Sequence, residues 1–182
     1  MDVIRPIFTY TDLTQLPEDG KRYEILEGDL AVSPSPNQKH QRCVWRIVSF
    51  FQLMEQAGYG QGYAAPFDVV FDEHNVTEPD VLFIRTERLS IVTEANVQGA
   101  PDLVVEVLSP STRARDLGVK VHLYARFHVQ EYWVADPDAE TLTVYRLGAD
   151  GYQQVGPLHD FNPVQSSLFP KSTLVVAELF RS

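Results

Sequence analysis

Two acidic residues interrupt stretches that are otherwise suited to buried β-strands. Glu106 lies in the middle of the β-branched run 102–108, between two prolines. An ionised carboxylate in such a strand is costly unless it is paired with a cation or bound to a metal ion. Asp80 begins a second apolar run, expected as a strand over 79–84. Two carboxylates on neighbouring central strands have the chemistry of a divalent-metal site.

The predicted site depends on how these two strands pair. If they lie side by side, Asp80 and Glu106 share one face at one end of the sheet. Mg²⁺ prefers oxygen ligands, usually one or two carboxylates with waters and substrate phosphate oxygens, and Mn²⁺ accepts the same ligands. The carbonyl of Val107 is a candidate third protein ligand. The sequence therefore predicts a site for Mg²⁺ or Mn²⁺.

Each acid also has a purely structural interpretation, which the sequence leaves open. Asp80 follows a proline at a strand entrance, where a solvated turn aspartate is common. Glu106 would equally fit a buried ion pair with an arginine or lysine. Glu24, at the start of a predicted hairpin, is either a fourth member of the site or an ordinary acid at a strand edge.

The helix expected after Glu106 supplies a cation. Asp116 and Lys120 are four residues apart and share a helix face, with Tyr124 one turn later. They form either a surface pair worth roughly 0.2–0.5 kcal/mol or a group in which Lys120 points over the sheet toward the acids. In the second case Lys120 orients a metal-bound water and neutralises charge in the transition state.

Strands and helices must position these residues. A β-hairpin is expected over 22–33, and the three- and four-residue spacing of apolar residues predicts a helix over 37–57. Two further helices are expected at 10–16 and 112–128. Further strands are expected at 64–71, 79–84, 102–108, 131–135, 142–147 and 173–179. A helix between two central strands is typical of a parallel crossover in a mixed sheet. The fold class is therefore α/β, or α+β by stricter definitions.

We expect a single domain over residues 1–182, since this length is most simply one domain with a substantial core. It divides into an N-terminal arm and hairpin over 1–36, a core over 37–137 and C-terminal strands over 138–182. Three aromatic residues of the last part either pack onto this core or line an interface with a partner; they are Phe161, Phe169 and Phe180.

The charge balance argues against easy binding of nucleic acid. The chain has 15 basic and 25 acidic side chains, a formal net charge of −10. Non-specific DNA affinity comes largely from lysine and arginine, so binding requires a local basic patch. The candidates are Lys39, Arg42 and Arg46, or Arg113, Arg115 and Lys120. The alternative is that these are solvated surface charges.

The composition also limits the chemistry and the compartment. Cys43 is the single cysteine, which excludes an intramolecular disulfide and a thiolate zinc site. His40, at the start of the second helix, is interpreted as a core or capping residue. No serine-nucleophile, phosphate-loop or zinc-protease motif is present. There is no signal peptide and no apolar run near 18 residues, so a soluble cytoplasmic protein without membrane contact is expected.

One block of sequence resembles a known family. The block comprises 101–112 together with Asp116, Lys120, Tyr124, 131–134 and 136–137. It resembles the Uma2 family, restriction-endonuclease-like proteins of the PD-(D/E)XK nuclease superfamily. Segments 23–28, 33–34 and 78–80 and His40 match as well. The resemblance covers roughly residues 10–147.

The resemblance implies a restriction-endonuclease-like core, a central mixed sheet flanked by helices, with a metal-dependent phosphodiesterase site. By position, Asp80 is the acid of the PD element and Glu106 the acid of the (D/E)XK element. Leu108 occupies the place of the superfamily lysine, and the resemblance implies that Lys120 takes that role. Glu24 matches an acid that often completes the site.

The function this implies is a Mg²⁺- or Mn²⁺-dependent endonuclease that hydrolyses phosphodiester bonds, with DNA as its expected substrate. Asp80 and Glu106 would hold the metal, assisted by Glu24. The alternative is a catalytically inactive module of the same fold that binds nucleic acid or protein. A homodimer is expected for the active form, since two sites related by a two-fold axis cut both strands of a duplex most easily.

Overall fold

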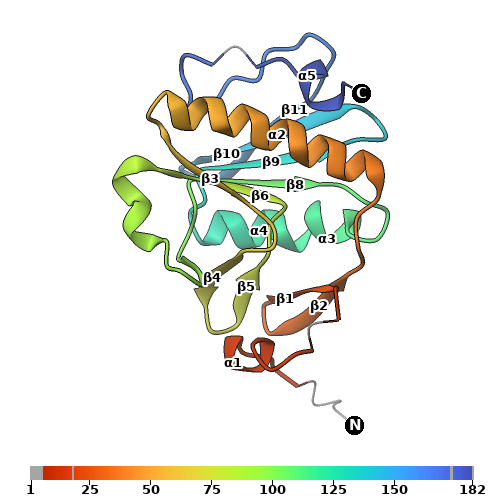
Figure 1. The fold of residues 1–182 in the computed structure, drawn as a ribbon, viewed down its shortest axis with the longest axis vertical. Coiled ribbons are helices and arrows are strands. Elements are labelled where there is room, and N and C mark those ends of the chain that lie inside the picture. The colour runs from red at the N-terminus through yellow and green to blue at the C-terminus, as the bar shows by residue number, and fades with distance from the viewer. Residues whose placement is uncertain (1–5, 18, 173, 182) are drawn as a thin grey trace.

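The structure is a computed structural model that describes residues 6–17, 19–172 and 174–181. Strands make two sheets, and helices cover the larger one (Figure 1). The helices are α1 (Tyr10–Leu13), α2 (Gln38–Gln56), the 3₁₀ helix η1 (Thr86–Ile91), α3 (Arg113–Asp116), α4 (Val119–Arg126) and α5 (Ala177–Phe180). The strands are β1 (Arg22–Leu26), β2 (Asp29–Ser33), β3 (Gly60–Ala64), β4 (Asp68–Asp72), β5 (Asn75–Thr77), β6 (Val81–Arg85), β7 (Asn96–Gln98), β8 (Leu103–Val107), β9 (Glu131–Asp136), β10 (Thr141–Gly148) and β11 (Gly151–His159).

The larger sheet is mixed, with the strand order β11-β10-β9-β8-β6-β3. The pair β8–β9 is parallel, and the chain between these two strands forms α3 and α4. All other neighbours in this sheet are antiparallel. The expected crossover unit, the mixed sheet and the α+β class are therefore confirmed.

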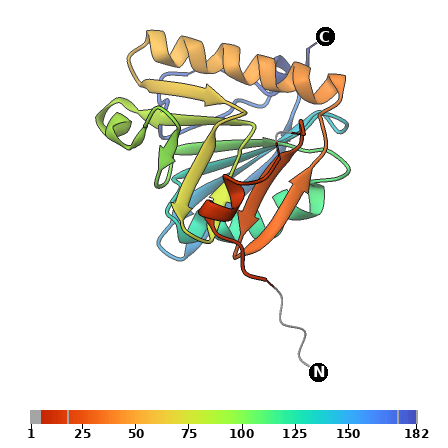
Figure 2. The same ribbon diagram turned by 60° about the horizontal axis from the view of Figure 1, so that its bottom comes forward.

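A second, five-stranded sheet has the order β2-β1-β5-β4-β7. It begins with the predicted hairpin, in which Glu27 and Gly28 both adopt positive φ, the combination that a tight two-residue turn requires. Figure 2 shows this hairpin in front of the larger sheet, with α1 beside it. The hairpin brings the start of β1 close to the end of β8, as the ion pairs described below show.

The central strands of the larger sheet, β6, β8 and β9, bury both of their faces. Every residue of β8 is buried, and alternate residues pack against different layers. Leu103, Val105 and Val107 pack on the α2 side with Ile47 and Phe51. Val104 and Leu108 pack on the α4 side with Leu123 and Tyr124. Glu106 falls in the second set by the same alternation, so its carboxylate points toward α4 and not toward α2.

Helix α2 forms where the apolar spacing predicts it. The Asn37 side chain caps its first turn by accepting a hydrogen bond from the amide of His40 at 3.0 Å. The helix ends before Gly58, which adopts a φ of +82° that glycine tolerates at no steric cost. Its buried face includes His40 and Cys43 at the N-terminal end.

Two predicted elements are each divided in the structure. The expected strand 64–71 corresponds mainly to β4 of the smaller sheet. Only its first residue, Ala64, belongs to β3 of the larger sheet, and Pro66, which has no amide hydrogen for a ladder, lies between the two strands. The expected helix 112–128 breaks at Gly118 into α3 and α4. Leu117, next to Gly118, is 40% exposed at this break.

The C-terminal part differs most from expectation. The strand expected at 173–179 is an isolated bridge between Pro163 and Val175 followed by α5; Thr173 lies outside the described residues. Strand β11 was not predicted, because an exposed edge strand has little apolar alternation. Phe169 is buried in the α2-side core, whereas Phe161 is 77% exposed. Phe180 packs partly against that core.

Among the described residues, no helix combines the length and apolarity that crossing a membrane would need.

Candidate active site

The antiparallel pair β6–β8 brings the two predicted metal ligands together. Val81 lies opposite Val105, so the next pair in this register is Asp80 opposite Glu106. The amide of Val107 donates a hydrogen bond of 2.8 Å to Oδ2 of Asp80. Asp80 and Glu106 are each only 3% exposed. The strand pairing on which the sequence prediction depended is therefore present.

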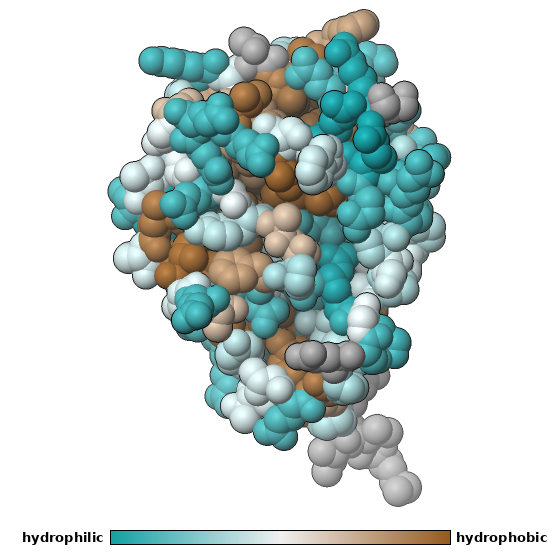
Figure 3. All heavy atoms as spheres, viewed as in Figure 1, coloured by the Kyte–Doolittle hydropathy of each residue, from teal (hydrophilic) through white to brown (hydrophobic). Residues whose placement is uncertain are grey.

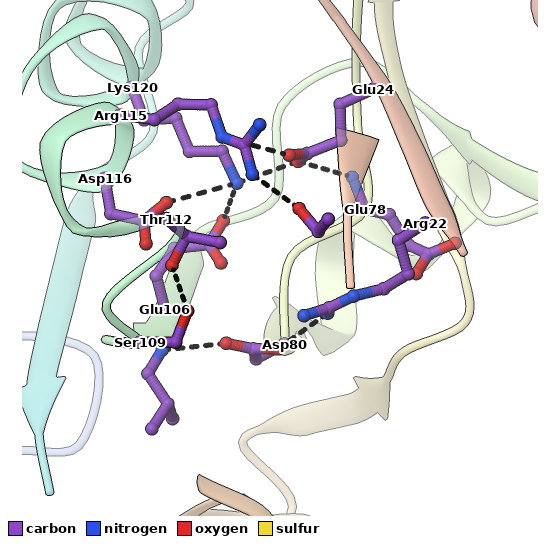
Figure 4. A network of polar contacts seen from close by, with 12 residues as sticks. Arg22, Glu24, Glu78, Asp80, Glu106, Ser109, Thr112, Arg115, Asp116 and Lys120 are labelled. Atoms are coloured by element: carbon purple, nitrogen blue, oxygen red, sulfur yellow. Dashed lines mark hydrogen bonds and ion pairs between the residues drawn. The ribbon is translucent and has the colours of Figure 1, made fainter. Parts of the chain in front are cut away.

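Lys120 lies between acids from three different elements (Figure 4). Its Nζ donates a 2.7 Å hydrogen bond to Oε1 of Glu106 in β8, and it pairs with Oε1 of Glu24 in β1, also at 2.7 Å. Oδ1 of Asp116, one turn earlier along the chain, is 3.6 Å away. Lys120 is 2% exposed, so the interpretation as a surface ion pair is wrong and the lysine points toward the acids.

The break between α3 and α4 determines where Lys120 lies. Gly118 has the non-helical angles φ −118° and ψ −102°, and a Cβ placed there would lie 2.7 Å from the carbonyl oxygen of Ala114. A larger residue would therefore force the two helices apart. The side-chain hydroxyl of Tyr124, one turn after Lys120, also donates to Oε1 of Glu106 at 2.9 Å.

Asp80 is bound by three groups of the protein. Arg22, the first residue of β1, donates from Nη1 to Oδ1 at 2.7 Å. Nε2 of His40 lies 3.1 Å from Oδ2, the oxygen that also accepts from Val107. The interpretation of His40 as a core residue thus describes its burial but misses its acidic partner. Arg22 was not singled out as a candidate.

The pKa values of Asp80 and Glu106 are shifted in opposite directions. Burial alone would raise the pKa of Asp80, but the His40 hydrogen bond and the charge of Arg22 outweigh it and hold that pKa below its ordinary value. Burial, reinforced by neighbouring carboxylates, raises the pKa of Glu106 from 4.5 to about 8 despite Lys120. The pKa of Lys120 lies well above its ordinary value, since the surrounding acids outweigh its burial. Lys120 is therefore a permanent ammonium ion.

The network contains more acids than cations. Its carboxylates belong to Glu24, Glu78, Asp80, Glu106 and Asp116, and its cations to Arg22, Arg115 and Lys120. If every carboxyl were ionised, these five acids would exceed the three cations by two negative charges, which one divalent cation would cancel. Without such a cation, the raised pKa values of Glu78 and Glu106 reduce this excess, because these carboxyls retain protons more readily. Oδ1 of Asp116 is buried without a hydrogen-bond partner, and so are Nε of Arg22 and Nε of Arg115.

The donor set fits a hard divalent cation, but only through two carboxylates. Within the residues that the structure describes, no three histidine, cysteine, aspartate or glutamate side chains form a metal-binding arrangement. Mg²⁺ requires only one or two carboxylates, with waters and phosphate oxygens completing its shell. Asp80 and Glu106 meet this requirement, and the Val107 backbone lies against Asp80.

An open cavity gives access to Asp80 from the surface. Its volume is about 340 Å³, and Arg22, His40, Glu78 and Asp80 contribute to its walls. Hydrophilic side chains gather along the right-hand side of the face in Figure 3, over the N-terminal end of α2. A larger cavity of about 510 Å³ lies between α2 and the C-terminal segment, and none of the candidate site residues lines it.

Sequence reasoning did not place three contributors in this network. Arg22 was not singled out, and Arg115 was considered only for a basic patch, because an arginine that pairs across the fold looks like any surface arginine. Glu78 stands two residues before Asp80, in the segment Glu-Pro-Asp. Its carboxyl has a pKa raised to about 7 by burial, and Arg22 is 3.7 Å away. The adjacency of two acids around a proline was the available clue.

Comparison with known proteins gives a consistent assignment. A crystal structure from Anabaena variabilis, described as that of a "putative nuclease", has the same fold with a TM-score of 0.77 and 23% sequence identity. The match covers 95% of this chain and 97% of that one. No curated protein matches the sequence. The Uma2 family, described as "Putative restriction endonuclease", matches residues 10–177. The chain belongs to the Uma2 family.

Proposed function

We propose that this protein is a divalent-metal-dependent nuclease that hydrolyses phosphodiester bonds in DNA. The family description supports a nuclease. The observation that carries the proposal is the position of Lys120, buried at 2.7 Å from both Glu24 and Glu106, next to the pair Asp80–Glu106. A lysine beside two acids at the end of a sheet is the arrangement that the (D/E)XK chemistry requires, here assembled from a helix because Leu108 replaces the strand lysine.

Asp80 and Glu106 would hold Mg²⁺ or Mn²⁺, with the carbonyl of Val107 as a further oxygen ligand. When bound, the metal lowers the pKa of a coordinated water and polarises the scissile phosphate. The carboxylates fix that water and phosphate relative to each other, and such positioning is a large part of the rate enhancement in phosphodiester hydrolysis.

Lys120 donates hydrogen bonds and does not remove a proton. Because its pKa is well above the ordinary value, the ammonium group stays charged at neutral pH. It can therefore orient the attacking water or stabilise negative charge that develops on the phosphate. Glu24 and Asp116 hold the lysine from two other directions. In this proposal Glu24 is a positioning residue that also reaches the metal through a water.

DNA as the substrate and a homodimer as the active species are part of the same proposal. A two-fold dimer places two sites against the two strands of a duplex. We also expect the protein to act in the cytoplasm.

The proposal is tested by calorimetric titration of Mg²⁺ and Mn²⁺ into wild type, Glu106→Ala and Lys120→Gln, with nicking of supercoiled plasmid measured in parallel. Wild type should bind one cation and nick DNA. Glu106→Ala should lose both properties. Lys120→Gln should keep metal binding and lose cleavage by about 10²–10³-fold, the usual effect of removing one donor to a transition-state charge.

Lys171→Gln is the control, since Lys171 is an exposed lysine that belongs neither to the site nor to either candidate basic patch. Normal cleavage by Glu106→Ala would exclude this site. Neither binding nor nicking by wild type would favour the inactive nucleic-acid-binding module.

A further inference from the structure

Arg22 occupies the side of Asp80 that faces the open cavity. Its Nη1 is 2.7 Å from Oδ1 of Asp80, whereas the other oxygen, Oδ2, lies 3.1 Å from Nε2 of His40 and accepts from the amide of Val107. Asp80 and Arg22 both line the cavity of about 340 Å³. A metal ion that enters from the cavity and binds Oδ1 therefore meets the guanidinium group first.

The guanidinium group is poorly satisfied where it stands. Nε of Arg22 is buried and has no hydrogen-bond partner, and the nearest acid oxygen, Oε1 of Glu78, is 3.7 Å away. Oε1 of Glu78 is likewise buried and unpaired by any hydrogen bond. Arg22 thus forms one short hydrogen bond although a guanidinium group has five donors. Its contact with Asp80 depends mainly on the attraction between opposite charges, and a divalent cation would supply that positive charge in its place.

We propose that Arg22 is a displaceable occupant of the metal position on Asp80, which binds a phosphate oxygen of the nucleic acid once the metal has taken its place. This inference rests on the proposed function. The side chain of Arg22 is 21% exposed and needs only to turn from Asp80 into the adjoining cavity. The planar guanidinium fork matches two phosphate oxygens, whereas the cavity wall at this point offers no comparable fork.

Arg22 and Lys120, two of the three cations of the network, differ in how firmly they are held. Lys120 is enclosed by three acids and 2% exposed, so it remains in place. Arg22 has one close acid and an open side. Of these two cations, Lys120 is fixed and Arg22 is mobile, and only Arg22 competes with metal.

Metal affinity of an Arg22 variant tests the competition without relying on activity. Mn²⁺ is titrated calorimetrically into wild type, Arg22→Gln and the matched control Arg126→Gln, which removes an arginine that pairs with Glu27 at 3.1 Å far from the cavity. Arg22→Gln should bind Mn²⁺ at least tenfold more tightly than wild type. Arg126→Gln should bind as wild type does. Equal or weaker binding by folded Arg22→Gln would overturn the competition, because a purely structural role for Arg22 predicts that outcome.

A second measurement uses the wild-type protein and does not depend on the stability of a variant. Phenylglyoxal labelling of Arg22, followed by mass spectrometry, should increase at least threefold when Mn²⁺ is added. It should fall again when a 20-base-pair DNA duplex is added with Ca²⁺ in place of Mn²⁺. Labelling that ignores the metal would contradict displacement, and labelling that rises but ignores DNA would contradict phosphate binding.

The outcomes separate this inference from the function on which it rests. One outcome is that wild type binds Mn²⁺, Glu106→Ala does not, and Arg22→Gln binds Mn²⁺ no more tightly than wild type. The metal site is then supported, and only the proposed role of Arg22 is wrong. If wild type does not bind Mn²⁺ but Arg22→Gln does, the competition is supported directly. If neither protein binds Mn²⁺, both proposals fail.

Discussion

At the residue scale, the site contains more acidic than basic side chains. Five acids and three cations occupy a volume from which water is largely excluded, and the acid oxygens respond with displaced pKa values. The pKa of Glu106 rises from 4.5 to about 8, because burial and three neighbouring acids oppose its ionisation. The ionised form of Glu106 is therefore destabilised in the folded protein, and a bound cation would reduce this destabilisation.

This destabilisation makes stability depend on pH. A carboxyl whose pKa is raised by folding contributes stability that is complete below its unfolded pKa, near 4.5, and is lost as pH rises to about 8. Glu106→Gln lacks this loss. In EDTA, the free energy of unfolding of the variant minus that of wild type should therefore be larger at pH 8.5 than at pH 5, so that the variant is relatively more stable at the higher pH.

Urea denaturation of both proteins at the two pH values measures the effect. The same difference between variant and wild type at pH 5 and pH 8.5 would show that Glu106 ionises as easily in the folded chain as in the unfolded one.

At the element scale, two features of the fold position the side chains of the site. The antiparallel register of β6 and β8 sets Asp80 opposite Glu106, and the break between α3 and α4 sets the direction of Lys120. The first was predictable, because apolar runs bounded by prolines identify the strands. The break was not predicted, although Gly118 is visible in the sequence, because an isolated glycine inside a helical pattern is usually tolerated.

The Gly118→Ala variant tests the importance of this break. The added methyl group would lie 2.7 Å from a backbone oxygen, so α4 must shift and carry Lys120 with it. We expect a loss of stability of about 1–3 kcal/mol, the usual cost of overpacking, and a loss of cleavage larger than the loss of folded protein explains.

Thermal denaturation and plasmid nicking together make this measurement. Gly148→Ala is the control, because its nearest neighbour is the flexible side chain of Gln153 at 3.1 Å. Full activity in Gly118→Ala would mean that the position of Lys120 does not depend on the break.

The sequence predicted the central elements better than the edges. Strands buried on both faces, such as β8 and β9, carry long apolar runs that are easy to recognise. The edge strand β11 contains Gly156 and Pro157 and is mostly exposed, so it has no such pattern. For the same reason the acids of the site were found from their unusual positions in apolar strands, whereas Arg22 was not, since its partner is 58 residues away along the chain.

At the scale of the whole molecule, the net charge of −10 opposes any polyanion. Without metal, binding of duplex DNA at physiological salt should be as weak as non-specific binding, with a Kd of about 10⁻⁴ M or weaker. Ca²⁺, which occupies oxygen sites without supporting cleavage in this account, should strengthen binding at least tenfold.

Fluorescence anisotropy of a labelled duplex in EDTA and in Ca²⁺ distinguishes the two functions. Equal binding in both conditions would favour a nucleic-acid-binding module whose basic surface acts without metal.

The most direct measurement is an anomalous difference map from crystals soaked in MnCl₂. The account predicts one strong peak within about 2.0–2.3 Å of carboxylate oxygens of both Asp80 and Glu106, with the Arg22–Asp80 contact broken. A map without a peak at this position, and with Arg22 still bound to Asp80, would contradict the assignment of these acids as a metal-dependent active site.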